Sequence, residues 1–308
     1  MISRHFVNKL RSRSTSTHFL NVKFLRVDTD LSVFRYHHKM SLKFAANISM
    51  MFQEIPTLEQ RYEAAKNAKF KYVELTFPYA EDIDKLKAAR ERAGVEQVLI
   101  NAYPGNLNTG DLGLAARPER IQDFKDGLEL SIQYANALNC KRMHILAGRV
   151  LKDISFEERN EYKKTYMDNL KYAADRLSQE GILALIEAVN NKISVPDYFL
   201  SCPHEGLEIV KKLNHPNLKF QFDIFHVQIM NGNLTKNIQE FLPYIGHIQL
   251  AQVPDRGEPD DNGEINFPYI FQVLKNVGYQ GYIGLEYKPR GKTEDGLIWM
   301  KQLHEIDL

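Results

Sequence analysis

Short apolar runs in the second half of the chain end in side chains that can do chemistry. The runs close as Ala-Leu-Ile-Glu187, Phe-Gln-Phe-Asp223, His-Ile-Gln249 and Gly-Leu-Glu286. Their apolar neighbours predict burial, and buried carboxylates that meet at one point repel one another unless a cation or shared protons offset the charge. One such acid would more often cap the next helix, whereas three in equivalent places on four successive runs predict a site. A divalent metal is the simplest solution, and all-oxygen ligands favour Mg2+ or Mn2+ over zinc.

Three further residues follow these run ends at short spacing. His226 comes three positions after Asp223, on the loop expected above that strand, where it could donate a hydrogen bond or move a proton. Arg256, in Pro-Asp-Arg-Gly-Glu, is expected on the loop after Gln249, and its planar donor fork suits a substrate carboxylate. Lys288 shares strand parity with Glu286 and is a second candidate for binding an anion. Taken alone, His226 could instead be a surface or partly buried histidine, and Arg256 an ordinary surface arginine.

Earlier runs contribute residues that we expect to line the same mouth. Asn101 closes one of these runs, and Glu74 and Asn47 each lie one residue before the end of another. Polar groups in such places also commonly bond loops. Three aromatic residues near these run ends could line a small dry pocket or simply belong to the hydrophobic core, and the core is the commoner outcome. They are Phe77, Tyr103 and Phe267.

The elements that must position these residues alternate along the chain. Eight short apolar runs read as strands, at 44–48, 72–75, 97–101, 142–146, 183–187, 218–223, 245–250 and 282–286. Amphipathic stretches between them read as helices, at 58–68, 83–93, 120–138, 156–179, 205–213, 235–241, 269–277 and 294–304. This alternation predicts parallel strands joined by crossover helices, and eight repeats match a closed (β/α)8 TIM barrel.

Glycines mark several helix ends in this pattern. Gly94, Gly181 and Gly278 each follow a helical stretch and precede a strand, where a left-handed C-terminal cap is easiest for glycine. No Pro/Ser-rich linker interrupts residues 41–308, which we therefore interpret as one barrel domain. An open doubly wound sheet is the alternative, but no Gly-rich phosphate-binding turn follows the first strand.

Composition narrows the classes of partner. The 308 residues carry a formal net charge of +1, so composition gives no support for electrostatic binding of nucleic acid. Cys140 and Cys202, in a chain without a signal-peptide core, predict free thiols and a reducing compartment. No apolar run approaches the roughly 20 residues of a membrane span. We expect a soluble protein with a small-molecule substrate, and composition leaves a homo-oligomer open.

Residues 1–40 differ from the rest of the chain. Arg4, Lys9, Arg11 and Arg13 alternate with Ser and Thr, and no acidic residue appears before Asp28. This composition is typical of a mitochondrial targeting segment, which would place the protein in the matrix. The alternatives, which suit a cytoplasmic protein, are a poorly ordered tail or an upstream start added to a protein whose working start is Met40.

The chain resembles the hydroxypyruvate isomerases, most closely their animal members, within the xylose-isomerase-like barrels. The resemblance spans nearly the whole chain after residue 40. Its segments are Phe-Ala-Ala-Asn-Ile-Ser-Met-Met-Phe (44–52), Val-Glu-Leu-Thr-Phe-Pro-Tyr (73–79), Gln-Phe-Asp-Ile-Phe-His (221–226), Gly-His-Ile-Gln-Leu-Ala-Gln-Val-Pro-Asp-Arg-Gly-Glu-Pro (246–259), Gly-Glu-Ile-Asn-Phe-Pro-Tyr (263–269) and Gly-Leu-Glu-Tyr-Lys-Pro (284–289).

The resemblance implies interconversion of 3-hydroxypyruvate and 2-hydroxy-3-oxopropanoate (tartronate semialdehyde), in glyoxylate metabolism. It implies that Glu187 and Glu286 exchange protons with the substrate, and that a divalent metal, where present, is held by Glu187, Asp223, Gln249 and Glu286. Related ketose epimerases carry histidine where this chain has Gln249, a departure that bears on metal affinity.

Three rival functions remain open at this stage. A ketose 3-epimerase or sugar isomerase would use the same acids on a longer polyol. An endonuclease for abasic DNA would want several histidine ligands for zinc and a basic rim. A barrel that only binds would have lost one or more of the strand-end acids, and none is missing.

Overall fold

Eight parallel strands form the wall of a barrel in the computed structural model, which describes residues 41–150, 154–302 and 306–307. The strands are β1 (Leu42–Asn47), β2 (Tyr72–Leu75), β3 (Glu96–Asn101), β4 (Arg142–His144), β5 (Leu183–Glu187), β6 (Leu218–Asp223), β7 (Ile245–Leu250) and β8 (Tyr282–Leu285). Each of the eight expected strands is present, with ends shifted by no more than two residues.

The first strand closes the ring. β1 pairs in parallel with β8, with Ala45 opposite Gly284, and with β2, with Ala46 opposite Val73. This closure rules out the open doubly wound sheet and confirms the TIM barrel. A short strand, β9 (Ile306–Asp307), also pairs with β1 and was not expected from the sequence.

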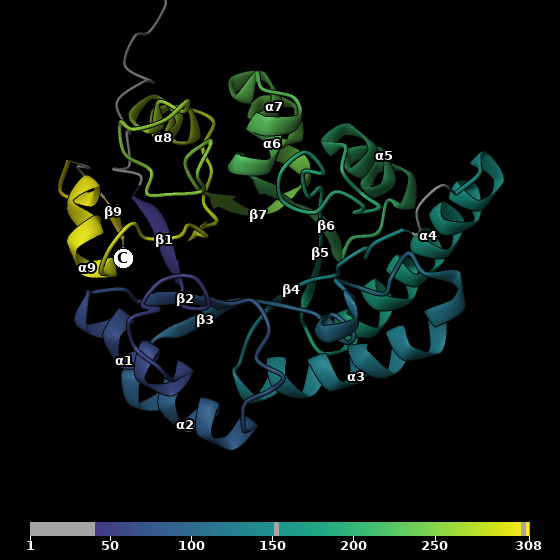
Figure 1. Cartoon of the computed structure of the whole chain (residues 1–308), viewed down its shortest axis with the longest axis horizontal. Helices are drawn as coiled ribbons and strands as arrows, with labels where there is room; N and C mark the ends of the chain where they lie inside the picture. Colours follow the sequence, from purple (N-terminus) through teal and green to yellow (C-terminus); the bar gives the residue numbers. More distant parts are fainter. Residues whose placement is uncertain (1–40, 151–153, 303–305, 308) are drawn as a thin grey trace, which may run out of the picture. The chain divides into compact units, whose positions relative to one another are not determined.

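Helices surround the strands on the outside of the ring (Figure 1). They are α1 (Leu58–Asn67), α2 (Ile83–Ala93), α3 (Ile121–Ala137), α4 (Phe156–Gln179), α5 (Pro203–Leu213), α6 (Ile224–Met230), α7 (Leu234–Phe241), α8 (Phe267–Asn276) and α9 (Thr293–Gly296). Short 3-10 turns cover η2 (Leu107–Thr109), η3 (Pro118–Arg120), η4 (Leu242–Tyr244) and η5 (Leu297–Gln302).

Two helix predictions need correction. The stretch expected as a helix over 294–304 is instead the single turn α9 followed by η5, and its end at 303–304 lies outside the described residues. The second correction concerns His226, which was expected on a loop but lies in the short helix α6, for which no helical pattern was recognised. The cause is local: the Asp223 side chain accepts a hydrogen bond from Phe225 N at 2.7 Å, which caps a helix directly at the end of β6.

Local signals in the sequence explain where the other helices begin and end. Asp82 caps α2 by accepting from Lys85 N at 3.0 Å. Ser155 and Glu158 form a reciprocal capping box at the start of α4. Gly94 ends α2 in the left-handed region, at φ 68°, as predicted.

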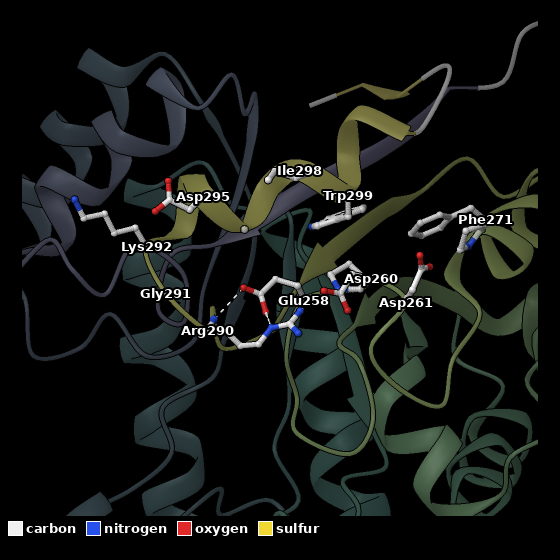
Figure 2. Close-up of a pocket in the computed structure, with 13 residues that line it drawn as sticks. Glu258, Asp260, Asp261, Phe271, Arg290, Gly291, Lys292, Asp295, Ile298 and Trp299 are labelled. Carbon is white, nitrogen blue, oxygen red and sulfur yellow. Dashed lines mark hydrogen bonds and ion pairs between the residues drawn. The ribbon is translucent and has the colours of Figure 1, made fainter.

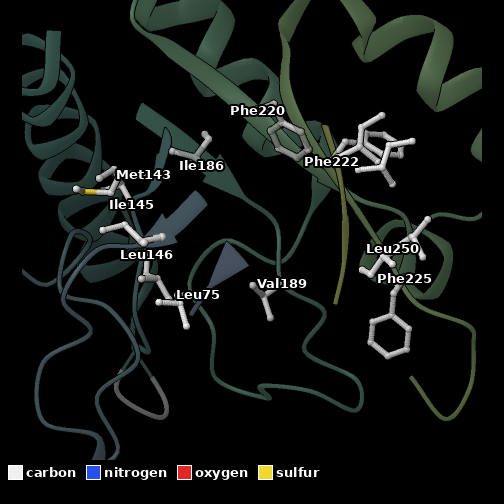
Figure 3. Packing of buried hydrophobic residues seen from close by; sticks show 14 of the residues in the cluster. Leu75, Met143, Ile145, Leu146, Ile186, Val189, Phe220, Phe222, Phe225 and Leu250 are labelled. Atoms are coloured by element: carbon white, nitrogen blue, oxygen red, sulfur yellow. The ribbon is translucent and has the colours of Figure 1, made fainter. Parts of the chain in front are cut away.

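The main hydrophobic core lies between the strands and the helices. In β6, Phe220 and Phe222 pack against Phe241 of α7, with ring centroids 5.1 and 5.5 Å apart. Figure 3 shows both beside Ile186 of β5 and other buried apolar side chains. Because successive strand residues point to opposite faces, Gln221 and Asp223 must face the barrel interior.

Three expectations about the whole chain have different outcomes. Cys140 and Cys202 are free thiols, the first buried and the second exposed. Within the described ranges, no helix is both long and apolar enough to cross a membrane. The basic segment over 1–40, with its predicted targeting role, lies outside the described residues.

Candidate active site

A cavity of about 400 Å3 opens at the carboxyl ends of the strands, where TIM barrels place their chemistry. Glu187, Glu286, His226, Arg256 and Lys288 all line it. Asn101 and Phe77, expected at the mouth, also line it. The other expected lining residues, Glu74, Asn47, Tyr103 and Phe267, do not belong to this cavity wall.

Glu187, Asp223 and His226 form a tight buried cluster. One ligand atom from each lies within 4.8 Å of the others. The Nε2 atom of His226 is 3.5 Å from Asp223 Oδ2 and 3.7 Å from Glu187 Oε1. These short separations follow from β5 and β6 being neighbours and from α6 starting where β6 ends.

Arg256 is the cation that contacts these buried acids. Its Nη2 atom is 2.5 Å from Glu286 Oε2 and 3.8 Å from Asp223 Oδ2, and its guanidinium stacks over Phe225 at 5.1 Å. Arg256 is on the loop after β7, as predicted, but it already pairs with two of the acids. Lys288 is exposed at the rim, where its backbone N–H donates to Arg256 O at 2.8 Å.

Gln249 belongs to a buried hydrogen-bond chain that continues into the barrel interior. The Gln221 Nε2 atom donates to Glu187 Oε2 at 2.9 Å and to Gln249 Oε1 at 2.5 Å. Gln249 Nε2 in turn donates to Glu74 Oε2 at 2.9 Å, and His247 Nε2 lies 2.5 Å from Glu74 Oε1. This chain explains why Glu74 is not at the mouth: it is buried beneath it.

His144 is a site residue that we did not predict. It ends β4, lines the cavity, and has its Nδ1 atom 3.3 Å from Glu187 Oε2. Both of its ring nitrogens are buried without a hydrogen-bond partner. The rule that selected Glu187 and Asp223, a polar residue closing a strand, missed His144 because the strand was expected to run on to Leu146, two residues beyond its observed end.

Burial controls the protonation of this site. It raises the pKa of Glu187 well above its usual value, with the nearby Asp223 and Glu286 charges adding to the effect. Burial raises the pKa of Glu286 to about 7, although Arg256 opposes the shift. It lowers the pKa of His144 to about 3 and that of His226 well below its usual value. The site therefore combines carboxyl groups that hold protons readily with neutral imidazoles.

A larger cavity, of about 660 Å3, lies beside α9 and the loop after β7 (Figure 2). Three of its charged groups pair with one another: Glu258 accepts from Arg290 N at 2.9 Å and Arg290 Nε at 2.8 Å, and Arg290 also pairs with Asp260. Size alone does not make it the reaction site, because it lacks the cluster of buried acids found at the barrel mouth.

The donor set at the mouth fits a divalent cation. Glu187, Asp223 and Glu286 bring three carboxylates against the single guanidinium of Arg256. Glu187 Oε1 is buried without a hydrogen-bond partner, which is costly for a carboxylate oxygen unless a ligand satisfies it. Glu187 and Asp223 are the residues best placed to hold the ion.

A closed barrel with buried carboxylates at its carboxyl-end mouth is the arrangement found in TIM-barrel enzymes. Comparison with known proteins makes the class specific. The model of the xylose isomerase-like TIM barrel family matches residues 62–303, and the chain belongs to this family.

Individual relatives agree with this assignment. The Danio rerio protein named "Putative hydroxypyruvate isomerase" is 52% identical over 265 residues, which cover 85% of this chain and 95% of that protein. The 2-oxo-tetronate isomerase of Pectobacterium atrosepticum is 45% identical and covers 83% of this chain and 96% of its own length. A crystal structure from Brucella melitensis, described as an AP endonuclease of family 2, is 41% identical with a TM-score of 0.80, covering 84% of this chain and 98% of that one. The curated relatives show that the chain is an isomerase.

Proposed function

We propose that this isomerase interconverts 3-hydroxypyruvate and 2-hydroxy-3-oxopropanoate. The observation that carries the proposal is that two buried glutamates, Glu187 and Glu286, line one small cavity together with two cationic side chains. The first pair suits proton transfer at carbon, and the second suits a substrate that carries a carboxylate. Relatives with the names hydroxypyruvate isomerase and 2-oxo-tetronate isomerase support the same chemistry.

The reaction moves a carbonyl between neighbouring carbons without net oxidation. A base removes one proton from C3 of hydroxypyruvate, the electrons of that bond form the C2=C3 bond of an enediolate, and an acid returns a proton to C2. The hydroxyl proton passes from the oxygen on C3 to the oxygen on C2. Glu187 and Glu286 would perform the two carbon transfers, and general acid-base groups of this kind contribute roughly 10^2 to 10^4-fold in rate.

The surroundings of the two glutamates are suited to these roles. A carboxyl group whose pKa lies near neutrality can both accept and return a proton at physiological pH, and that of Glu286 is raised to about 7. Gln221 fixes Glu187 by donating to its Oε2 atom, while Oε1 accepts no hydrogen bond from the protein. Arg256 fixes Glu286 in the same way.

The substrate carboxylate needs a cation beyond the reacting carbons. Arg256 is engaged with Glu286 and Asp223, whereas Lys288 lines the cavity from its exposed rim. Lys288 would therefore make the principal contact, with Arg256 supplying positive charge from below. This division differs from the sequence-based expectation, which put Arg256 first.

A divalent ion, Mg2+ or Mn2+, would be held by Glu187 and Asp223, with Glu286 completing the carboxylates of the expected set. Gln249, the fourth expected ligand, already accepts from Gln221 and donates to Glu74. When bound, it supplies Lewis-acid stabilisation to negative charge that develops on a substrate oxygen. The oxygen-rich donors favour these ions.

Longer substrates and DNA are the main rivals. The four-carbon acid 2-oxo-tetronate would use the same proton transfers and the same cations, and the Pectobacterium relative carries that name. A neutral ketose would leave Lys288 without a partner charge. Cleavage of abasic DNA by a zinc cluster is disfavoured, because the described residues that line the mouth include only two histidines, His144 and His226, and the net charge is only +1.

The decisive experiment is an isomerisation assay on a panel of three- to six-carbon substrates, with and without chelator. Hydroxypyruvate should give the highest kcat/KM, and 2-oxo-tetronate should also be turned over. Faster turnover of a neutral five- or six-carbon ketose would replace the proposal with the epimerase or sugar-isomerase reading. Release of nicked product from abasic DNA would overturn it entirely.

A further inference from the structure

The hydrogen bonds of His226 fix which of its ring nitrogens carries the proton. The backbone N–H of Asn190 donates to His226 Nδ1 at 3.2 Å, and the Asn190 side-chain nitrogen Nδ2 lies 2.7 Å from the same atom. Both residues are fully buried, with exposed fractions of 0% and 2%. Water therefore does not compete for these contacts.

The orientation of the Asn190 amide is itself determined by its other bonds. Its Oδ1 atom accepts from the backbone N–H groups of Ile193 at 3.0 Å and Ser194 at 3.1 Å. Its Nδ2 atom donates to Ser194 Oγ at 2.9 Å. Exchanging the oxygen and nitrogen of the amide would turn the first two bonds into repulsions between donors, so the nitrogen must face His226.

Two N–H donors thus meet Nδ1, which must act as an acceptor. In a neutral imidazole one nitrogen accepts and the other carries the hydrogen, so the hydrogen is on Nε2. That atom is the one directed toward Asp223 Oδ2 and Glu187 Oε1, and His226 lines the cavity.

We infer that Asn190 is a positioning residue that holds His226 as an Nε2–H donor toward the reacting oxygens, and that a bound cation is held by the carboxylates without His226. A histidine that binds a metal almost always donates its other ring N–H to an acceptor such as a carboxylate or a carbonyl. Here the other nitrogen meets two donors, which is the opposite arrangement. The short separations within the Glu187, Asp223 and His226 cluster are therefore not those of a three-residue metal site.

The inference rests on the proposed function for what the donor does. The negative charge of an enediolate is shared between the oxygens on C2 and C3, and a preorganised N–H donor stabilises it without having to reorient. An aspartate at 190 would accept from Nδ1 and draw the hydrogen there, which would leave Nε2 as an acceptor or a metal ligand. The choice between an amide and an acid at this position thus decides what His226 can do.

The test is the ring-nitrogen NMR spectrum of the full-length protein labelled with 15N-histidine, recorded without added metal. A protonated and an unprotonated ring nitrogen have well-separated shifts, and His226→Gln identifies the signals. Wild type should show the Nε2–H form. Asn190→Asp, which has the same size, should place the proton on Nδ1 and lower kcat by roughly 10^2-fold, the usual cost of one lost oxyanion donor, with a smaller change in KM.

Two further variants keep the test decisive. Ser194→Ala removes a bond to Asn190 without touching His226, and should leave the tautomer unchanged. Asn190→Ala removes only the side-chain donor, and because the backbone N–H of residue 190 still meets Nδ1, this variant should keep the Nε2–H form even if the aspartate variant fails to fold. An Nδ1–H signal in wild type or in Asn190→Ala, or a pure Nε2–H signal in Asn190→Asp, would overturn the inference. These spectra do not depend on turnover, so the inference can fail while the isomerase assay succeeds, and the reverse.

Discussion

Glu187 and Glu286 are chemically equivalent side chains in unequal surroundings. Glu187 accepts from the neutral amide of Gln221, whereas Glu286 accepts from the charged guanidinium of Arg256. Substituting glutamine for either keeps the shape and removes a proton-transfer group. We expect each single variant to lose several powers of ten in kcat, and the double variant to be little worse, because the two groups act as a unit. Steady-state kinetics on folded protein, verified by circular dichroism, would show this; near-normal turnover by one variant would remove that residue from the chemistry.

The raised pKa of Glu286 also gives stability a pH dependence. Between its ordinary value of 4.5 and about 7, the folded state binds a proton that the unfolded state has released, so stability falls as pH rises through this window. Wild type should therefore lose more stability than Glu286→Gln between pH 5 and pH 7.5. Urea unfolding in the presence of chelator measures the difference. Parallel losses in both proteins would show that Glu286 titrates normally.

The two cations at the mouth should separate in kinetics. Lys288→Leu removes a partner of the substrate carboxylate, and we expect KM for hydroxypyruvate to rise about tenfold, with kcat preserved. Arg256→Leu should lower kcat as well, because it also removes the guanidinium that pairs with Glu286. Activity on an uncharged ketose serves as the control for Lys288. Equal losses on charged and uncharged substrates would assign Lys288 a structural role.

At the scale of elements, the packing of β8 depends on glycine having no side chain at position 284. Gly284 lies opposite Gln249 in β7, and a Cβ atom there would overlap the carboxylate of buried Glu74. Gly284→Ala should cost about 1 to 3 kcal/mol, as overpacking of a core does. Gly291→Ala is the matched control, since a Cβ there meets open space. Chemical denaturation compares the two, and equal stability of both variants would mean that Glu74 moves aside freely.

Most of the elements could be predicted from the sequence, because alternating apolar runs and amphipathic stretches fix where parallel strands and crossover helices occur. The ends of the last four strands revealed Glu187, Asp223, Gln249 and Glu286 for the same reason. What escaped prediction depends on tertiary contacts. Asn190 has no periodic or strand-end signature, and its role follows only from a contact with a residue 36 positions away. Helix α6 was missed because a seven-residue helix capped by a strand's last residue has almost no pattern of its own.

At the scale of the whole molecule, cation binding should appear as stability. An ion that binds only the folded chain stabilises it by about 2.7 kcal/mol at 100 times its Kd, which corresponds to a rise in Tm of several degrees for a protein of this size. Chelation should reverse the rise and reduce turnover. Asp223→Asn should weaken the effect more than Gln249→Ala, because an anionic ligand binds a hard cation more strongly than an amide. Unchanged calorimetric traces with Mn2+ and Mg2+, together with full activity of metal-free protein, would remove the ion from the site.

The buried hydrogen-bond chain from Glu74 to Glu187 has a direction. An acid that accepts at one end obliges the Gln249 amide to point its nitrogen inward and its oxygen toward Gln221. Gln221 in turn donates both of its amide hydrogens, to Gln249 and to Glu187. The polarity of the whole hydrogen-bond chain is thus set by a single carboxyl group beneath the cavity, at a residue that is not part of the cavity wall. A mutation that neutralised Glu74 would free both amides to reverse, and the active site would then receive an acceptor where it now receives a donor.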